Sequence, residues 1–441
     1  MSRPRPLSGF PELLPRQRIV EQQVVDHLRR AFELHGFANI QTRAVEPMDQ
    51  LLRKGETSKE VYVLRRLQAE ADDGGDAGLG LHFDLTVPFA RYVLEHAGKL
   101  QFPFRRYQIQ QCWRGERPQE GRFREFWQAD IDIVDRDGLP AHYEVEIPLV
   151  IADALRGLPL PPVRMHVNNR KLSQGFYQGL GIGDTEEALR IIDKLDKIGA
   201  DGVAELLVER VEATPEQAEA CLRLASISSE DASFVDEVKA LGVADPLLEE
   251  GLNELAAVVE AAAEEAPGLV IADMKIARGL DYYTGTVYET FLEGHEGLGS
   301  ICSGGRYDTL ASDGKHTYPG VGLSIGVSRL LVPLLQSGSL TATREVPTCV
   351  LVALANEEDR SEANALARRL RSRGVPVQVS PSAAKYGKQI KFADRRGIPF
   401  VLFDGDEGLQ MKDIRSGEQT PVDVDVWEPP AADLHPRIVA E

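Results

Sequence analysis

The stretch Gln111 to Gln128, QCWRGERPQEGRFREFWQ, decides how this chain folds. Two segments suited to strands flank a loop that Pro118 and Gly121 shape into a turn. Four arginines fall within eleven residues, and planar guanidinium groups suit bidentate binding of phosphates. The loop therefore predicts an anion site, with surface ion pairing as the alternative. The arginines are Arg114, Arg117, Arg122 and Arg124, and the acids available for pairing are Glu116, Glu120 and Glu125.

Segments on either side of this loop alternate polar and apolar side chains at the period of a strand. FWQADIDIV (126–134) continues directly from the loop, and LHFDLTVPF (81–89) precedes it. Such alternation is typical of antiparallel sheets, whose polar face either meets water or forms the floor of a cleft. The shared polar faces would carry Gln128, Asp130 and Asp132 in the first segment and His82, Asp84 and Thr86 in the second.

Elsewhere the sequence pattern predicts helices and a separate C-terminal domain. Residues 15–35 repeat apolar side chains at helical spacing, and 184–265 read as wholly helical. Strands return from about residue 284, so the helical block is an insertion in a sheet domain. The polar stretch 336–346 predicts a linker, and beyond it strands alternate with helices. The expected domains are 1–170 with 266–335, the insertion 171–265, and the C-terminal domain 345–441.

Charge is distributed unevenly along the 441 residues. The formal net charge is −19, but residues 171–265 hold 7 basic and 22 acidic side chains, a net of −15. Residues 368–396 hold nine basic side chains and one acidic, a net of +8. A local basic surface can hold a polyanion on an acidic protein. The overall charge therefore does not exclude a nucleic-acid partner.

Several classes of protein do not fit the sequence. The chain lacks a run of about 18 apolar residues, so no membrane span is expected. Its first residues, MSRPRPLSGFPELLP, lack the apolar core of a secretory signal, and we expect a cytoplasmic protein. The four cysteines are scattered without ligand spacing, which disfavours a structural zinc site.

Three further segments favour a pocket for an anion beside a flat polar ring. ARGLDYYTGT (277–286) sets an arginine and two tyrosines among glycines, and SGGRYD (303–308) reads as a Gly-Gly turn. GVGLSIGVSRLL (320–331) allows close backbone approach before a helix that carries Arg329, but it is neither a Rossmann fingerprint nor a P-loop. Taken singly, each also reads as a turn, a core tyrosine or a surface arginine.

Together these segments resemble one enzyme family. Residues 111–128 resemble motif 2 of the class II aminoacyl-tRNA synthetases, and 320–331 resemble motif 3. RGLDYYTGT and SGGRYD are similar to the two histidine motifs of histidyl-tRNA synthetases. LRKGETSKEVY, DLTVPFARY, KYGKQIKFADRRGIPF and KDIRSGEQ also resemble that family. The resemblance implies an α+β fold with an antiparallel sheet flanked by helices, a helical insertion and a C-terminal α/β anticodon-binding domain.

The resemblance also implies a reaction in two steps. The carboxylate of L-histidine attacks the α-phosphate of ATP, giving histidyl-adenylate and pyrophosphate, and the terminal ribose of tRNA-His then takes the histidyl group. Such displacement depends on positioning and charge stabilisation. For ATP, the resemblance places Arg114 at the α-phosphate, Glu116 near the adenine amino group, Phe126 under the adenine ring, Arg122 at the distal phosphates and Arg329 at the γ-phosphate.

A second set of residues is implied for histidine. Arg278 would bridge the histidine carboxylate and the α-phosphate, so Arg278 and Arg114 are the expected catalytic residues. The protein itself is expected to hold no metal, while Mg²⁺ would accompany the β- and γ-phosphates of ATP. The expected histidine-binding residues are Asp84, Thr86, Arg114, Gln128, Asp132, Arg278, Tyr282 and Tyr283.

The sequence departs from the family pattern at two positions. Arg43 stands where motif 1 commonly has proline, and Ser328 stands where motif 3 commonly has glutamate. The resemblance implies a homodimer, and the first departure bears on its contacts. Two alternatives remain: a regulatory paralogue that binds histidine without activating it, and a paralogue that passes histidine to an acceptor other than tRNA. The retained arginines and C-terminal domain disfavour the first, and the basic segment disfavours the second.

Overall fold

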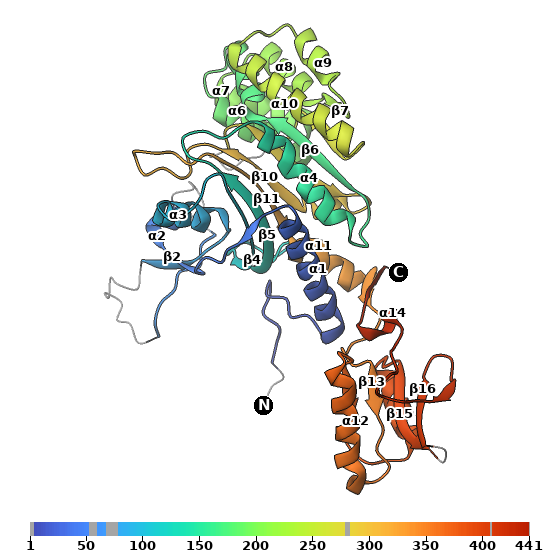
Figure 1. Cartoon of the computed structure of the whole chain (residues 1–441). Coiled ribbons are helices and arrows are strands. Elements are labelled where there is room, and N and C mark those ends of the chain that lie inside the picture. Colours follow the sequence, from blue (N-terminus) through green and yellow to red (C-terminus); the bar gives the residue numbers. More distant parts are fainter. Residues whose placement is uncertain (1–3, 53–59, 68–77, 278–282, 406–407, 441) are drawn as a thin grey trace. The chain divides into compact units, whose positions relative to one another are not determined.

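The computed structural model describes residues 4–52, 60–67, 78–277, 283–405 and 408–440. By its internal contacts the chain forms two compact units, residues 1–11 with 25–333, and residues 12–24 with 334–441. Figure 1 shows the elements of both. In the part of the chain described, no helix is long and apolar enough to cross a membrane.

A nine-stranded, mainly antiparallel sheet is the centre of the first unit, in the order β1-β4-β5-β11-β10-β9-β6-β8-β7. Only β1 with β4 and β6 with β8 pair in parallel. The strands are β1 (Ala38–Asn39), β4 (Phe104–Trp113), β5 (Glu125–Val134), β6 (Val163–Asn169), β7 (Ser228–Ser229), β8 (Val270–Asp273), β9 (Thr286–Leu292), β10 (Cys302–Tyr307) and β11 (Gly320–Gly326). A separate pair consists of β2 (Val45–Pro47) and β3 (Leu79–Leu81). This confirms the expected α+β class and the two strands around the arginine loop.

Helices cover the sheet, and α4 packs against β5 and β11. The helix expected over 15–35 is present as α1. The helices outside the insertion are α1 (Pro15–Leu34), α2 (Met48–Leu51), α3 (Thr86–His96), α4 (His142–Arg156) and α11 (Val327–Ser337), with a short 3₁₀ helix at Glu296–Leu298.

The strand expected over 81–89 is wrong. β3 ends at Leu81, and α3 begins at Thr86. Pro88 suits the first turn of a helix and cannot donate to a sheet ladder. Asp84 accepts a hydrogen bond from the Val87 backbone N–H at 3.1 Å, which supports the helix start. The alternation arose because the connecting residues are buried between elements.

The Gly-Gly turn expected at 303–308 is also wrong, because these residues form strand β10. A Cβ atom at Gly304 would lie 2.0 Å from the carbonyl oxygen of Gly322 in β11. A Cβ atom at Gly305 would lie 2.7 Å from the carbonyl oxygen of Thr286 in β9. The glycines therefore permit close approach of neighbouring backbones within the sheet.

The insertion is helical, apart from the two residues of β7, which pair with β8 at the sheet edge. Its helix starts follow from local sequence. Thr214 and Gln217 form a reciprocal capping box at the start of the helix that begins at Pro215, and Asp245 caps the helix that begins at Pro246. The helices are α5 (Arg170–Gly179), α6 (Thr185–Ile192), α7 (Leu195–Val211), α8 (Pro215–Ala225), α9 (Phe234–Ala240) and α10 (Pro246–Glu265).

Two glycines allow α5 and α10 to pack closely against each other. A Cβ atom at Gly175 would lie 2.1 Å from the backbone nitrogen of Leu248, and one at Gly251 would lie 2.2 Å from that of Leu172. Each helix thus presses its backbone onto a glycine of the other. Since α5 follows β6 directly and α10 leads into β8, this contact lies at the base of the insertion.

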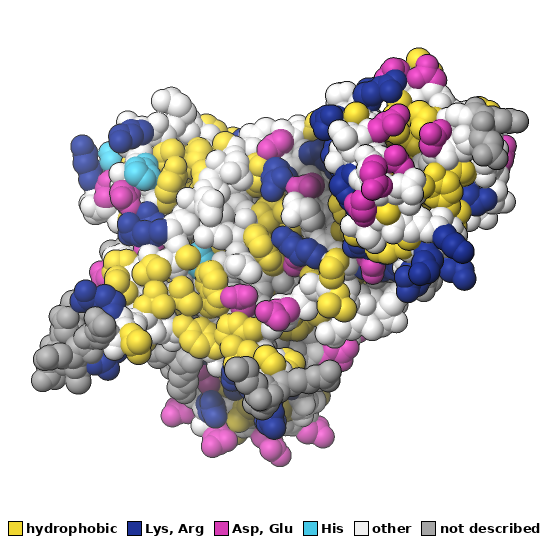
Figure 2. Space-filling model, turned by 90° about the horizontal axis from the view of Figure 1, so that it is seen from below, with side chains coloured by type: hydrophobic (Ala, Val, Ile, Leu, Met, Phe, Trp, Pro, Cys, Tyr) yellow, Lys and Arg dark blue, Asp and Glu magenta, His cyan; other side chains and the backbone are white. Residues whose placement is uncertain are grey.

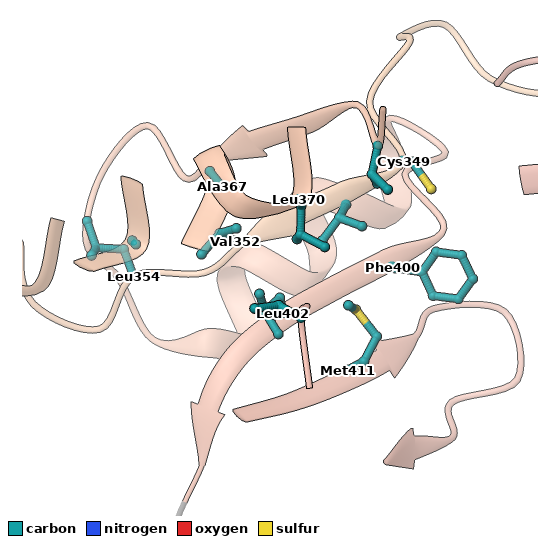
Figure 3. Packing of buried hydrophobic residues seen from close by; sticks show 12 residues of the cluster. Cys349, Val352, Leu354, Ala367, Leu370, Phe400, Leu402 and Met411 are labelled. Carbon is teal, nitrogen blue, oxygen red and sulfur yellow. The ribbon is translucent and has the colours of Figure 1, made fainter. Parts of the chain in front are cut away.

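The second unit contains a five-stranded mixed sheet in the order β14-β13-β15-β16-β17. Side chains of β13 alternate between two cores: Val352 packs with Leu370 of α12, and Leu351 packs with Ala393 of α13. Figure 3 shows the first of these cores, with Ala367 and Leu370 of α12 over Val352, Leu402 and Met411. Helices on both faces of the sheet make this unit α/β, as expected.

The linker expected over 336–346 is wrong in part, because it contains β12, which pairs with β18. The strands of this unit are β12 (Leu340–Ala342), β13 (Val350–Val352), β14 (Val377–Val379), β15 (Phe400–Gly405), β16 (Gly408–Asp413), β17 (Gln419–Pro421) and β18 (Ile438–Ala440). Its helices are α12 (Arg360–Ser372), α13 (Tyr386–Arg395) and α14 (Ala431–Leu434), with a 3₁₀ helix at Glu357–Asp359.

Candidate active site

A cavity of about 540 Å³ lies within the first unit. Its lining comes from strands β5, β9, β10 and β11, from the arginine loop between β4 and β5, and from the start of α11. Segments far apart in the sequence therefore meet here. Of the residues expected to bind substrate, the lining includes Arg114, Glu116, Arg122, Phe126, Gln128, Tyr283 and Arg329.

Polar side chains that the strand register places side by side form the floor of this cavity. Asp130 in β5 lies opposite Gln108 in β4 and Ser324 in β11. Ser324 lies opposite Ser303 in β10, which in turn lies opposite Glu289 in β9. Because cross-strand neighbours share a face, these side chains form one polar row. Ser324, Ser303 and Glu289 from this row line the cavity.

The arginine loop supplies two cationic groups to the wall. Arg114 donates from Nε to the Phe83 carbonyl oxygen at 2.9 Å, and its guanidinium carbon lies 5.2 Å from the centre of the Phe126 ring. Arg122 lies 3.8 Å from the carboxylate of Glu116, with both side chains partly exposed. Arg124, a third arginine of the loop, donates to the backbone carbonyl oxygen of Glu116. Ion pairing thus accounts for little of this cluster.

Arg329 reaches the cavity from the first turns of α11. Its Nε donates to the carbonyl oxygen of Gly121 at 3.2 Å, and its Nη1 donates to that of Ser300 at 2.7 Å. Gly121 has a φ of +67°, a conformation that favours glycine. These bonds attach the guanidinium to the turn of the arginine loop. The early helical position expected for Arg329 is confirmed.

Tyr283 lines the cavity and also packs against a hydrophobic cluster that contains Phe89 and Tyr307. A Cβ atom at Gly305 would lie 3.1 Å from the Tyr283 ring, so this glycine leaves room for the tyrosine. Arg278 and Tyr282, the other two residues expected from this motif, lie outside the described residues.

A buried charge network holds the chain immediately after Tyr283. Arg306 donates to Glu144 at 2.8 Å and to Asp308 at 3.0 Å. Thr284 donates its hydroxyl to Asp308 at 2.5 Å, and the Thr286 N–H donates to Glu144 at 3.2 Å. Arg306 of SGGRYD is therefore a largely buried residue that stabilises this segment, and the alternative that it is a surface arginine is wrong.

Three residues expected to bind histidine are absent from the cavity lining. Asp132 is 3% exposed and forms an ion pair with Arg106 at 2.6 Å, while its other oxygen accepts from Tyr307 at 2.7 Å. Asp84 is 5% exposed and supports the start of α3, where Thr86 is the first residue. The structure places these side chains near the floor without opening them to the cavity.

Asp130 is a buried residue that the motif assignments did not include. It accepts a short hydrogen bond from the Ser324 hydroxyl, and Ser324 accepts from the Gln128 amide nitrogen at 2.8 Å. Burial raises the pKa of Asp130 to about 7, with Arg106 opposing the shift and Asp132 adding to it. The sequence did indicate Asp130 in one respect, because the alternation places it on the same strand face as Gln128 and Asp132.

Comparison with protein families decides the identity of the fold. A family model described as histidyl-tRNA synthetase matches residues 9–330, which include every segment of the cavity. The chain belongs to the histidyl-tRNA synthetase family. A second model, described as an anticodon binding domain, matches residues 348–427 in the second unit.

Relatives match along nearly the full length. The chain is 59% identical over 451 residues to a histidine--tRNA ligase from Cutibacterium acnes, covering 100% of this chain and 99% of the relative. It is 59% identical over 453 residues to the ligase from Micrococcus luteus, covering 99% of each. The crystal structure of histidyl-tRNA synthetase from Nostoc sp. PCC 7120 matches with a TM-score of 0.86 and 35% identity, covering 97% of this chain and 98% of that one.

The helical insertion of this synthetase forms part of the cavity wall, which sequence reasoning missed. Arg170 and, from α6, Glu186 and Arg190 line the cavity together with Asp193. Arg170 is 8% exposed and forms a short ion pair with Glu186. Because the partners lie sixteen residues apart in different helices, helical spacing gave no signal for the pair.

The two departures from the family pattern have local explanations. The Ser328 hydroxyl accepts a hydrogen bond from the Trp127 backbone N–H at 2.9 Å and so connects α11 to β5. Arg43 pairs at 3.2 Å with Glu46, whose carboxylate is fully buried and also accepts from Arg91 at 2.6 Å. Both residues serve local structure.

The basic segment of the anticodon-binding domain divides into two parts. Two arginines of α12 and its C-terminal cap bind within their own domain: Arg369 pairs with Asp425, and Arg373 donates to the Val424 carbonyl oxygen. Lys385, Lys388 and Lys391, by contrast, lie exposed at the start of α13 and along it. Exposed positive charge therefore lies on both helices, with the lysines at α13 and with Arg368, Arg369 and Arg371 on α12.

Proposed function

We propose that the cavity activates L-histidine with ATP and presents the activated group to tRNA-His. The reaction is that of a histidine–tRNA ligase, as full-length relatives and the anticodon-binding domain establish. The observation that carries the assignment to this cavity is its composition. The cavity brings together arginines from two separate segments, the Phe126 ring beside Arg114, and the polar side chains of the strands that form its floor.

For ATP we propose that Phe126 stacks on the adenine ring and Glu116 accepts from its amino group. The support is their place on the cavity wall beside Arg114. Arg122 and Arg329 would then bind the distal phosphates, and Arg114 the α-phosphate. Guanidinium groups held at fixed positions stabilise the charge that develops during displacement. Arg278, which we assign from its sequence motif alone, would bind both the histidine carboxylate and the α-phosphate.

For histidine we propose that Gln128 and Tyr283 contact the substrate, with Tyr282 completing the wall around the imidazole. The ammonium group would lie over Asp84, Thr86 and Asp132. Two buried carboxylates near the floor favour a cation there even without direct contact.

We propose that Mg²⁺ enters with ATP on its β- and γ-phosphates. Among the residues described, no cluster of three or more His, Cys, Asp or Glu side chains suits a metal ion. Mg²⁺ on a nucleotide needs only one or two protein carboxylates, and Glu289 lines the cavity. The metal would neutralise phosphate charge beside Arg122 and Arg329.

For tRNA we propose that α13 faces the anticodon arm through Lys385, Lys388 and Lys391. Exposed lysines attract phosphate groups and make binding dependent on salt. The insertion, with its net charge of −15, would contact the acceptor arm sparsely or control access to it.

We propose that the synthetase works as a homodimer in the cytoplasm. Leu79 of β3 and Val63, which bridges to Gly80 of β3, are exposed hydrophobic residues. Figure 2 shows a broad hydrophobic area on one face of the molecule. Contiguous apolar surface marks association sites. The location follows from the compartment in which tRNA is charged for protein synthesis.

Histidine-dependent exchange of pyrophosphate into ATP, followed by charging of tRNA-His, tests the proposal. Arg122→Ala should weaken exchange strongly, while Arg117→Ala, in the same loop but outside the cavity lining, should leave it near the original rate. Lack of exchange by folded protein would refute histidine activation. Exchange without charging would favour an acceptor other than tRNA, and histidine binding without exchange would favour a regulatory paralogue.

A further inference from the structure

We propose that Asp130 is a positioning residue that acts through Ser324 to set the polarity of Gln128 toward the cavity. In one state Gln128 offers histidine a hydrogen-bond acceptor, and in the other a donor. The proposal deepens the assigned function and rests on the placement of histidine in this cavity.

Three side chains from two neighbouring strands form a directed chain of hydrogen bonds. The Gln128 amide nitrogen donates to the Ser324 hydroxyl at 2.8 Å, and Ser324 donates to Asp130 through a short bond. Gln128 and Ser324 line the cavity, whereas Asp130 is 2% exposed beneath them. The carbonyl oxygen of the Gln128 side chain has no hydrogen-bond partner among the described residues, although it is buried.

The direction of the chain follows from the charge of its buried end. An ionised carboxylate only accepts hydrogen bonds, so Ser324 must give its single proton to Asp130. Ser324 then has only lone pairs to offer Gln128, which turns its amide nitrogen toward the serine. The Gln128 oxygen consequently faces away from the serine as an acceptor. The ammonium of histidine and a protonated imidazole nitrogen are both donors, which an acceptor suits.

Protonation reverses this direction. When the Asp130 carboxylate takes up one proton from solvent, its new O–H group can donate to Ser324. The serine proton is then released toward Gln128, and rotation of the amide lets its oxygen accept that proton's hydrogen bond. The amide nitrogen now meets the substrate, and two donors face each other. Histidine binding weakens in this state because the substrate group is left without a partner.

The groups around Asp130 make the change accessible near neutral pH. Arg106 in β4 favours the ionised form, while Asp132 in β5 and Asp84 before α3 oppose it. Cys302 in β10 also faces it, and burial together with Asp130 raises the pKa of that thiol, so it stays neutral. Burial outweighs the arginine and raises the pKa of Asp130 to about 7.

The test measures KM for histidine in pyrophosphate exchange between pH 6 and 8.5. At pH 8, Asp130→Asn and Ser324→Ala should each raise this KM by about tenfold or more, the value of a hydrogen bond to a charged group, with KM for ATP nearly unchanged. The double variant should raise KM for histidine no further than the single variant with the larger effect, because both changes break the same chain of hydrogen bonds.

The pH profile separates positioning from mere structural support. The ratio of KM for Asp130→Asn to KM for the original protein should fall toward one at pH 6, where Asp130 is neutral. Titration of histidine itself cancels in this ratio. An unchanged KM at pH 8, additive effects, or a ratio independent of pH would each overturn the proposal. Lack of exchange by the unmodified protein would instead overturn the assigned function, and this inference with it.

Discussion

Replacing Arg306 by methionine should destabilise the first unit strongly, because the network around this arginine is buried. The Arg306 side chain is 16% exposed and that of Glu144 is 3% exposed. Methionine keeps much of the aliphatic volume but removes both charged hydrogen bonds, at 2.8 Å to Glu144 and 3.0 Å to Asp308. Glu144 would keep the Thr286 N–H as a donor, with no cation opposite it.

The magnitude follows from the cost of an unpaired buried charge. Removal of one partner from a buried ion pair costs about 3–5 kcal/mol. Glu144→Gln in the same protein removes the remaining charge, so the double variant should recover a part of that loss, about 1–3 kcal/mol. Arg164→Met is a matched control, because Arg164, like Arg306, pairs with two carboxylates but is 38% exposed. Its loss should stay below about 1 kcal/mol.

Urea unfolding followed by tryptophan fluorescence measures this change. The tryptophans are Trp113, Trp127 and Trp427, so a Trp427→Phe background confines the signal to the first unit. A loss from Arg306→Met no greater than that from Arg164→Met would refute the reasoning. So would a double variant that loses the full sum of the two single changes.

Three further outcomes follow from the structure. Gly251→Ala should cost at least about 2 kcal/mol by thermal unfolding, since its Cβ would lie 2.2 Å from the Leu172 nitrogen, whereas Gly183→Ala, with open space around it, should be nearly neutral. Arg329→Ala should raise KM for ATP at least about tenfold in exchange assays and leave KM for histidine nearly unchanged, and equal effects on both would contradict its phosphate role. Asp130 has a folded pKa of about 7, raised above that of the unfolded chain, so the native state binds the extra proton and stability falls as pH rises from 5 to 8. Asp130→Asn should remove this contribution, and parallel stability curves for the two proteins would refute it.

Sequence patterns predicted the elements whose signals are local. The helix over 15–35 is present because it buries one periodic face. The alternating strand 126–134 is present too, although both of its faces are buried from residue 128 onward. The arginine loop between two strands is also present, with Gly121 at a φ of +67° in its turn. The segment 81–89 misled because buried connecting residues imitate a strand, and only Pro88 marked the helix.

Most of the site depends on pairing that sequence spacing does not encode. Asp130 meets Ser324 because β5 lies beside β11, although 194 residues separate them. The Gly304–Gly305 pair reads as a turn until its neighbours in the sheet are known. Arg170 reaches the cavity only through the fold of the insertion. Motif resemblance supplied candidate residues, while the register of the sheet decides which of them share a surface.

The interlocked glycines of α5 and α10 also bear on how this protein can change over evolutionary time. They bring the two ends of the insertion together just beyond the parallel strands β6 and β8. Residues 180–245 therefore form a loop whose ends are already joined. Shortening or replacing that loop leaves the order of the strands from β1 to β8 intact, at the cost of the edge strand β7 and of Glu186 in the cavity wall. The base of the insertion is thus a natural site for exchanging modules between relatives or in engineered synthetases.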